Sequence, residues 1–251
     1  MGALLVGVSA HAAGPGSAWQ GEADCEGLFE RLPSSLPGGA VVESRMDDAT
    51  LYRLPEGGTL RIEGPEVVRE ALSGATFAEA QADLRERAPF DLRGNHVGAA
   101  QGVVLAQVES AYNGEVSLYG DATGFGAVEG GAELLIQPTV HLASWDGYAQ
   151  ASAPDRDRWD RALCEQAHHE LGHILVAAQV MTEAEPELAG LTSATREGIA
   201  LAMRTKLEDM MSAIRRRQER YHAEIKVIGE RAADSRPYLE QPFSWLSGSR
   251  G

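Results

Sequence analysis

The chain is poor in positive charge and in long apolar segments. Its 251 residues contain 22 lysines and arginines against 37 aspartates and glutamates, which gives a formal net charge of −15. Nucleic acids and anionic membrane surfaces attract positive charge, so this balance argues against both as partners. No later segment is apolar over the ~18 residues that a membrane-spanning helix needs. The sequence also shows no phosphate-binding glycine loop, no heptad repeat and no serine–histidine triad motif.

Cysteine is scarce as well, because only Cys25 and Cys164 occur. In an exported protein these two can form one disulfide that closes a long loop; otherwise they remain separate thiols. Spacing alone does not decide between the two alternatives. Cys164 lies about one helical turn before the histidine motif described below. Motifs of that kind take their third metal ligand from downstream, which argues against Cys164 as a ligand.

The first residues resemble the end of a bacterial secretory signal. A short apolar run from Met1 to Val8 is followed by Ala10-His11-Ala12, the A-x-A pattern of a cleavage site. The basic region that usually begins such a signal is missing, and an ordinary flexible N-terminus is the alternative. We expect residues 1–13 to be a signal-peptide remnant and the protein to be secreted or periplasmic.

Glycine, serine and proline mark residues 14–64 as a leader with short strands, which precedes a main domain at 65–232 and a loose tail at 233–251. The strands expected from apolar alternation are 41–45, 50–54, 59–63 and 67–72. Thr76 and Glu79 form a capping box, which predicts a helix that ends near Arg87.

A second group of strand patterns follows that helix. The segment 101–112 leads into Asn113-Gly114, a strong hairpin-turn pair, and 115–119 would be the returning strand. A glycine-rich turn at 120–131 and a strand at 132–142 complete the pattern. These features predict an antiparallel meander of three strands.

Two long amphipathic helices are expected in the C-terminal half. The first begins at the capping box Ser152–Asp155 and ends near Met181, followed by a polar loop that Pro186 interrupts. The second begins near Ser193 and carries one apolar stripe. The predicted fold is therefore α+β, with a small antiparallel sheet packed on the first helix and the second helix covering the other side.

The first helix contains H-E-L-G-H at residues 169–173. Residues four apart lie on the same helix face, so His169 and His173 can bind one metal ion. Both lie off the apolar stripe of the helix, which favours a metal site over buried core histidines. His168 is off the shared face and is more simply a solvent-facing histidine. Glu170 can take a proton from a water molecule at the metal, the arrangement of zinc metallopeptidases.

A catalytic zinc ion usually has three protein ligands, and the motif supplies only two. The metzincin extension is excluded because position 179 is glutamine. The remaining downstream candidates are His222 and four glutamates: Glu183, Glu185, Glu187 and Glu197. If the second helix folded straight back on the first, His222 would overshoot the motif. If the connecting loop itself travels back, His222 comes within reach.

Three groups of residues between Val67 and Ile228 resemble a bacterial family of unknown function that is described as secreted zinc-dependent proteases. They are Gly74-Ala75-Thr76 with Pro89 and Gly94; the strand at 140–142 with Trp159, Leu163 and H-E-L-G-H; and Tyr221. The chain departs from the family after Tyr221, because the closing T-x-H-G is absent and His222 stands where the family tends to have aspartate.

The motif and the resemblance together imply an exported, zincin-type metallopeptidase that hydrolyses peptide bonds. His169, His173 and His222 would bind Zn²⁺, with Glu170 as general base and then proton donor. Tyr221 is assigned, from its residue type alone, to stabilise the oxyanion. The partner would be a peptide or protein substrate, paired with an exposed strand. The alternatives are a zinc-binding protein without hydrolytic activity and a cell-envelope interaction protein.

Overall fold

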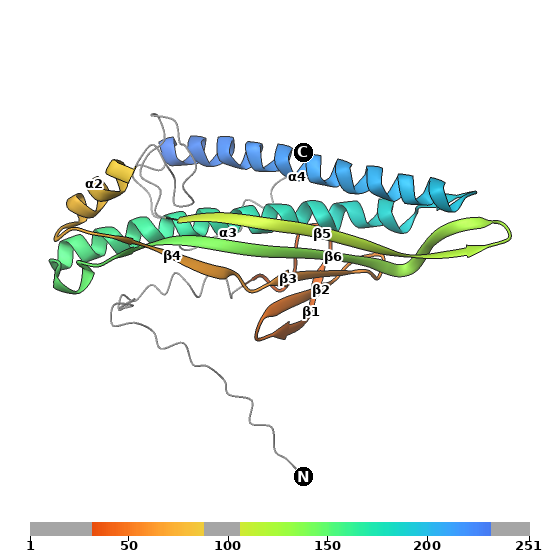
Figure 1. The fold of residues 1–251 in the computed structure, drawn as a ribbon, viewed down its shortest axis with the longest axis horizontal. Helices are drawn as coiled ribbons and strands as arrows, with labels where there is room; N and C mark the ends of the chain where they lie inside the picture. The colour runs from red at the N-terminus through yellow and green to blue at the C-terminus, as the bar shows by residue number, and fades with distance from the viewer. Residues whose placement is uncertain (1–31, 88–105, 232–251) are drawn as a thin grey trace, which may run out of the picture.

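The computed structural model describes residues 32–87 and 106–231, which form an α+β fold with three α-helices and one mixed, seven-stranded sheet (Figure 1). The strands are β1 (Val41–Met46), β2 (Ala49–Arg53), β3 (Thr59–Glu63), β4 (Glu66–Leu72), β5 (Ala106–Asp121), β6 (Gly124–Trp145) and β7 (Thr192–Ser193). The helices are α2 (Phe77–Arg87), α3 (Ala153–Ala189) and α4 (Arg196–Arg231), with a short 3₁₀ turn at Tyr148–Gln150. Residues 1–13, 101–105 and 233–251, about which the sequence makes predictions, lie outside the described residues.

The sheet is built around β6, and it is mixed rather than antiparallel as predicted. β5 pairs antiparallel with one side of β6, while β3 and β4 both pair parallel with the other side. β3 lies beside 133–136 and β4 beside 139–145 of the same strand. Because β6 is 22 residues long, it has room for two short partners in succession. The predicted leader strands β1 to β3 therefore belong to the same sheet as the rest of the chain.

The predicted turn at Asn113-Gly114 is wrong, because β5 continues through both residues. Gly114 pairs with Leu134, and a Cβ atom on it would lie 3.0 Å from side-chain carbons of Leu134 and of Leu207 on α4. Glycine here allows close packing of Leu134 and Leu207 and does not form a turn. The chain reverses only between Asp121 and Gly124, where the Asp121 carboxylate accepts from the amide of Thr123 at 2.7 Å. The predicted three-strand meander is a single long hairpin.

The N-cap hydrogen bonds of both predicted capping boxes are present. The amide of Glu79 donates to Oγ1 of Thr76 and the amide of Thr76 to the Glu79 carboxylate, both at 3.2 Å. At the start of α3, the amide of Asp155 donates to Oγ of Ser152 at 3.3 Å. These contacts satisfy amide groups that have no partner inside a first helical turn, so the helix starts were predictable from local sequence.

The end of α3 was predicted wrongly, because the helix continues past Met181 and through Pro186 to Ala189. Glu185 explains the extension. Its side chain is fully buried, and its carboxylate accepts from the amides of Glu56 at 3.0 Å and Gly58 at 2.7 Å, in the turn between β2 and β3. This charged contact with a distant turn stabilises the last helical turns where Pro186 weakens them.

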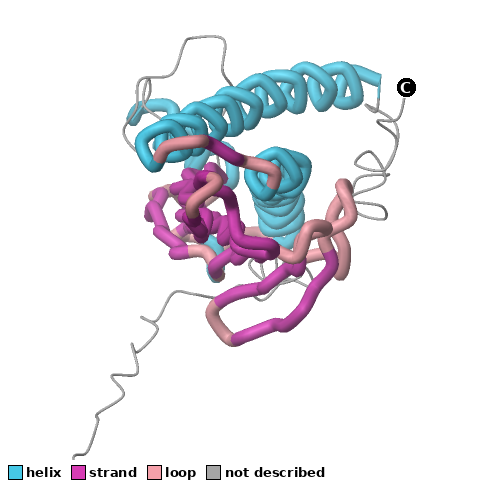
Figure 2. Tube along the Cα trace, turned by 90° about the vertical axis from the view of Figure 1, so that its right-hand side faces the viewer, coloured by secondary structure: helices cyan, strands magenta, loops and turns pink. Residues whose placement is uncertain are grey.

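α3 packs against the sheet, and α4 lies across α3 and the β5–β6 hairpin and contacts both (Figure 2). Every residue from Leu171 to Thr182 is buried, and the largest fully buried side chains come from β2, β3, β4, β6 and α3. None of the helices in the described ranges combines the length and the apolar character that a membrane crossing requires.

The connection between the two long helices sets their register. α3 runs about 16 residues past His173, or roughly 24 Å, whereas His222 lies about 26 residues into α4, or roughly 39 Å. The two lengths can match because the chain does not turn back directly at the end of α3. It first continues in the same direction to the far end of the β5–β6 hairpin (Figure 1). There β7 pairs with Phe125 and Gly126, and α4 begins (Figure 1). The loop thus travels onward before the chain turns back, and His222 returns to the level of His173.

Candidate metal centre

Three histidines from two helices form a cluster. His169 and His173 lie on α3 and His222 on α4, with one ring nitrogen of each within 4.8 Å of the others. Nε2 of His169 and Nε2 of His173 are 3.2 Å apart. The shared helix face predicted for the first two is thus observed, and His222 approaches both. No other group of metal-binding side chains is found within 32–87 and 106–231.

The environment keeps these imidazoles neutral. Burial, together with the neighbouring His222, lowers the pKa of His169 to about 4. Burial, with His169 and His222 nearby, lowers the pKa of His173 to about 3. The pKa of His222 is also lowered by burial. A metal ion binds the unprotonated imidazole, so this cluster is ready to bind a cation at neutral pH without first releasing protons. Three neutral imidazoles match the donor set of a catalytic zinc ion.

The four glutamates considered as third ligands have other places in the structure. The Glu183 carboxylate accepts from Gln179 at 2.7 Å and from Arg217 at 3.0 Å. Glu185 is held by the β2–β3 turn, and Glu187 pairs with Lys206. Glu197 is exposed in the first turn of α4, about 25 residues or roughly 37 Å of helix before His222. Among the described residues, only His222 joins the pair on α3.

Tyr221 and Gly172 fix the distance between the two helices at the cluster. The Tyr221 ring stacks on the His169 ring at 5.2 Å, and its hydroxyl donates to the His169 carbonyl at 2.9 Å. A Cβ atom at position 172 would lie 1.9 Å from that hydroxyl, so only glycine leaves room for it. Tyr221 is buried behind the histidines and is not among the cleft-lining residues. This place gives no support to the oxyanion role predicted for Tyr221.

Glu170 faces the edge of the sheet. Its Oε2 accepts a hydrogen bond from the amide of Val108 on β5 at 2.8 Å. Since that amide points away from β6, the alternation of an antiparallel pair also turns the peptide groups of Ser110 and Tyr112 away from β6. The carboxylate next to the histidines is therefore fixed beside the edge of β5 that faces away from β6.

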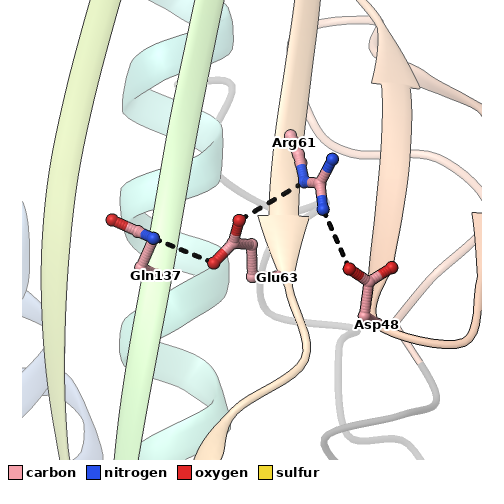
Figure 3. A network of polar contacts seen from close by, with 4 residues as sticks. All are labelled: Asp48, Arg61, Glu63 and Gln137. Carbon is pink, nitrogen blue, oxygen red and sulfur yellow. Dashed lines mark hydrogen bonds and ion pairs between the residues drawn. The ribbon is translucent and has the colours of Figure 1, made fainter. Parts of the chain in front are cut away.

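A cleft of about 820 Å³ opens at the cluster. It is lined by Val108, Ser110, Ala111, Tyr112, Gln137, Thr139, Glu170, His173, Gln218 and His222. On one wall, Gln218 donates to the Tyr112 hydroxyl at 3.1 Å. On another, the Gln137 amide donates to Glu63, which pairs with Arg61 and, through it, with Asp48 (Figure 3). Strand β5, helix α3 and helix α4 thus all contribute side chains to one polar cleft.

Sequence reasoning missed Tyr112, Gln218 and Gly172. Gln218 lies four residues before His222, so its helix face was predictable once His222 was chosen. Tyr112 was not predictable, because the expected turn at Asn113-Gly114 placed it at the end of a strand. Gly172 is part of the motif, but its function depends on a tyrosine 49 residues away that packs against it.

His168 and Cys164 lie outside the cluster, as expected. Burial lowers the pKa of His168, but its ring is not part of the histidine group. Cys164 is buried and disulfide-bonded, so it offers no thiolate to a metal. Cys25, the only other cysteine of the chain, lies outside the described residues.

The remaining residues of the family resemblance have structural positions. Gly74 adopts φ +133°, which favours glycine, and its carbonyl accepts from the Trp145 indole at 2.7 Å. The rings of Trp145 and Trp159 lie 5.6 Å apart, and Phe77 packs edge-on against Trp159 at 6.3 Å. This aromatic cluster connects α2, the end of β6 and the start of α3. The Pro89 and Gly94 part of the resemblance lies outside the described residues.

Residues 68–226 match a family of bacterial proteins of unknown function (DUF922). This match covers more than half of the chain, and the chain belongs to that family. It includes all three histidines, Glu170 and the cleft-lining strands. No curated protein and no solved structure matches the chain.

Proposed function

We propose that this family member is an exported zinc metallopeptidase of the zincin type. The observation that supports the proposal most strongly is the cluster of three neutral histidines, of which His173 and His222 line the same cleft as Glu170. His169 and His173 come from one helix, as in H-E-x-x-H peptidases, and His222 completes the set. A zinc ion held there would act as a Lewis acid toward a peptide carbonyl and would acidify a water molecule.

Glu170 is the proton carrier of the proposed reaction. It takes one proton from water as the water oxygen bonds to the peptide carbonyl carbon, and the carbonyl π electrons move to the carbonyl oxygen. When those electrons return and the C–N bond breaks, Glu170 gives this proton to the leaving nitrogen. The products are a carboxylic acid and an amine, and the glutamate ends in its initial ionised form.

The β5 edge is the proposed binding surface for the substrate. The peptide groups of Ser110 and Tyr112 turn away from β6, beside Glu170, so an extended peptide can form main-chain hydrogen bonds with them. The cleft is lined by uncharged polar groups, apart from Glu170 and the histidines. Because the protein has a net charge of −15, neutral or basic segments are the better substrates.

Export is supported by the bonded state of Cys164. Disulfides persist in oxidising compartments and are rare in the bacterial cytosol. Cys164 is buried on α3, the helix that carries His169 and His173, and is disulfide-bonded. A secreted or periplasmic location agrees with this bond and with the signal-like residues 1–13.

One observation favours a second candidate, a zinc-binding protein without hydrolytic activity. The Oε2 atom of Glu170 is occupied by the Val108 amide in the free protein. If this bond held the carboxylate away from water, the site would bind zinc and leave peptides intact. The third possibility from the sequence, a cell-envelope interaction protein with an accidental motif, predicts no metal at all.

The deciding experiment combines zinc content with hydrolysis of unfolded protein substrates. It compares the wild type with His169→Ala, Glu170→Gln and, as a matched control, His168→Ala, which changes a neighbouring histidine outside the cluster. We expect one zinc per chain in the wild type, in Glu170→Gln and in His168→Ala, and none in His169→Ala. Hydrolysis should be lost in Glu170→Gln by about 10³-fold or more and kept in His168→Ala. Zinc without turnover in the wild type supports the second candidate, and a wild type that binds no zinc rejects both.

A further inference from the structure

Among the described residues, Tyr112 is the one tyrosine that lines the cleft. It stands on β5, and its hydroxyl accepts a hydrogen bond from the side-chain amide of Gln218 at 3.1 Å. Gln218 lies four residues before His222 on α4, so the two side chains share one helix face. The hydroxyl is therefore fixed, through one contact, to the helix that supplies the third histidine.

The hydrogen bond from Gln218 decides which way the Tyr112 proton points. Because the amide N–H donates to the phenolic oxygen, the O–H of Tyr112 is left to donate to another acceptor. Burial raises the pKa of Tyr112 more than its hydrogen bonds with Gln218 and Ser110 lower it. The phenol thus keeps its proton at neutral pH, and it faces a cleft that also contains Glu170 and His173.

The position of Tyr221 does not suit its hydroxyl to donate a hydrogen bond into the cleft. Its hydroxyl already donates to the His169 carbonyl at 2.9 Å, and its side chain is only 4% exposed. An oxyanion group must reach the space where the substrate carbonyl lies. Of these two tyrosines, Tyr112 meets that condition.

We propose that the Tyr112 hydroxyl donates a hydrogen bond to the carbonyl oxygen of the scissile peptide as negative charge develops on it, and that Gln218 positions this hydroxyl. This inference rests on the proposed peptidase function. Tyr112 keeps its proton throughout, so the proton balance of the reaction is still carried by Glu170. Tyr112 is a catalytic residue, because it contacts the reacting oxygen, and Gln218 is a positioning residue.

The test uses the zinc-loaded wild-type protein, Tyr112→Phe and Gln218→Met, with Tyr119→Phe as the matched control. Tyr119 lies on the same strand but is 51% exposed and is not part of the cleft. Three quantities are measured for each protein: zinc content, kcat and KM on an unfolded protein substrate, and affinity for two peptide ligands. One ligand is a phosphinic peptide, which imitates the tetrahedral oxyanion; the other is a thiol peptide, which binds zinc without an oxyanion.

Tyr112→Phe should lower kcat by about 10²- to 10³-fold, with KM and zinc content nearly unchanged. Its affinity for the phosphinic peptide should fall by about tenfold or more, while its affinity for the thiol peptide stays the same. Gln218→Met should lower kcat by about 5- to 10-fold and add no further loss in the Tyr112→Phe background, because both changes remove one hydrogen-bonded unit. Tyr119→Phe should match the wild type.

Full kcat and full phosphinic-peptide affinity in Tyr112→Phe would overturn the inference. If the wild type hydrolyses nothing but binds the phosphinic peptide in a Tyr112-dependent way, the oxyanion site stands and the peptidase function fails. A wild type with neither hydrolysis nor phosphinic-peptide binding overturns both.

Discussion

The two long helices both supply histidines to the cluster, but they hold them differently. α3 is central: twelve consecutive residues after Glu170 are buried, and His173 is only 8% exposed. α4 is peripheral, with buried residues on a single stripe and with His222 exposed. The α3 pair is therefore fixed by the protein core, whereas His222 is placed by the docking of one helix on another.

This difference indicates how the site is assembled. His169 and His173 lie on the buried helix α3 with their Nε2 atoms 3.2 Å apart. His222 and Gln218 arrive together when the β7 anchor and Tyr221 set the register of α4. We therefore expect His169 and His173 to determine most of the metal affinity and of its effect on stability. His222 should change both by smaller amounts.

The largest expected effect concerns zinc affinity. If three histidines shared a binding free energy of about 12 kcal/mol equally, each would contribute about 4 kcal/mol, or about 10³-fold in affinity. We expect His173→Ala to lose at least this factor and His222→Ala to lose about 10²-fold, because the exposed His222 side chain loses more freedom when it binds. Competition titration with a chelating dye measures both. Equal losses would show that the two helices hold their ligands alike.

A second prediction concerns acid stability of the metal-free protein. An unfolded histidine has a pKa near 6.5, whereas His169 and His173 have pKa values of about 4 and about 3 when folded. Below pH ~6.5 the unfolded chain therefore binds protons that the folded chain does not. Stability should be fully present above pH ~6.5 and should fall as the pH decreases toward these lower values.

Urea unfolding of chelator-treated protein, at several pH values between ~7 and ~5, tests this prediction. The control is the double variant His169→Asn/His173→Asn, in which the fall should be much smaller. An identical fall in both proteins would show that other groups cause it, and that the core does not hold this pair in its neutral form.

Gly172→Ala should have the next largest effect, because it separates the two helices directly. The added Cβ would lie 1.9 Å from the Tyr221 hydroxyl, so α4 must shift. We expect a loss of about 2 kcal/mol, since overpacking of this kind outweighs the ~1 kcal/mol that alanine gains in helix propensity. In a Tyr221→Ala background the same substitution should stabilise the protein. Thermal unfolding of all four proteins gives the coupling energy, and additive effects would contradict the contact.

Local patterns predicted the parts of the fold that depend on neighbouring residues. The capping boxes at Thr76 and Ser152, the strand at 59–63 and the shared face of His169 and His173 all follow from spacings of two to four residues. The sequence also placed His222 among the candidates, but it could not choose between His222 and the glutamates. That choice depends on β7, two residues that pair with the far hairpin and delay the start of α4.

The wrong predictions share one physical cause, which is a long-range contact that overrides a local preference. Gly114 resembles a turn residue but serves the packing of Leu207 from α4. Pro186 resembles a helix end, but Glu185 is held by two amides of a turn over 120 residues away. β4 pairs parallel with β6 only because β6 extends far past β3. Tyr112 was missed for the same reason. The turn expected at Asn113-Gly114 placed Tyr112 at the end of a strand and not in the middle of one that lines a cleft.

The smallest expected effect is that of His222→Ala on the stability of the metal-free protein. His222 is exposed and its ring is not part of the α4 stripe that packs on the core, so the change should stay within about 0.5 kcal/mol. With zinc in excess, the free energy of unfolding of the same variant should be lower than that of the wild type by about 2.7 kcal/mol. The reason is that zinc bound 10²-fold more weakly stabilises the folded state by that much less. Urea unfolding with chelator and with zinc measures both values. A large loss without metal would mean that His222 helps to seat α4 before any metal binds, and that the outer helix belongs to the core more than its exposure indicates.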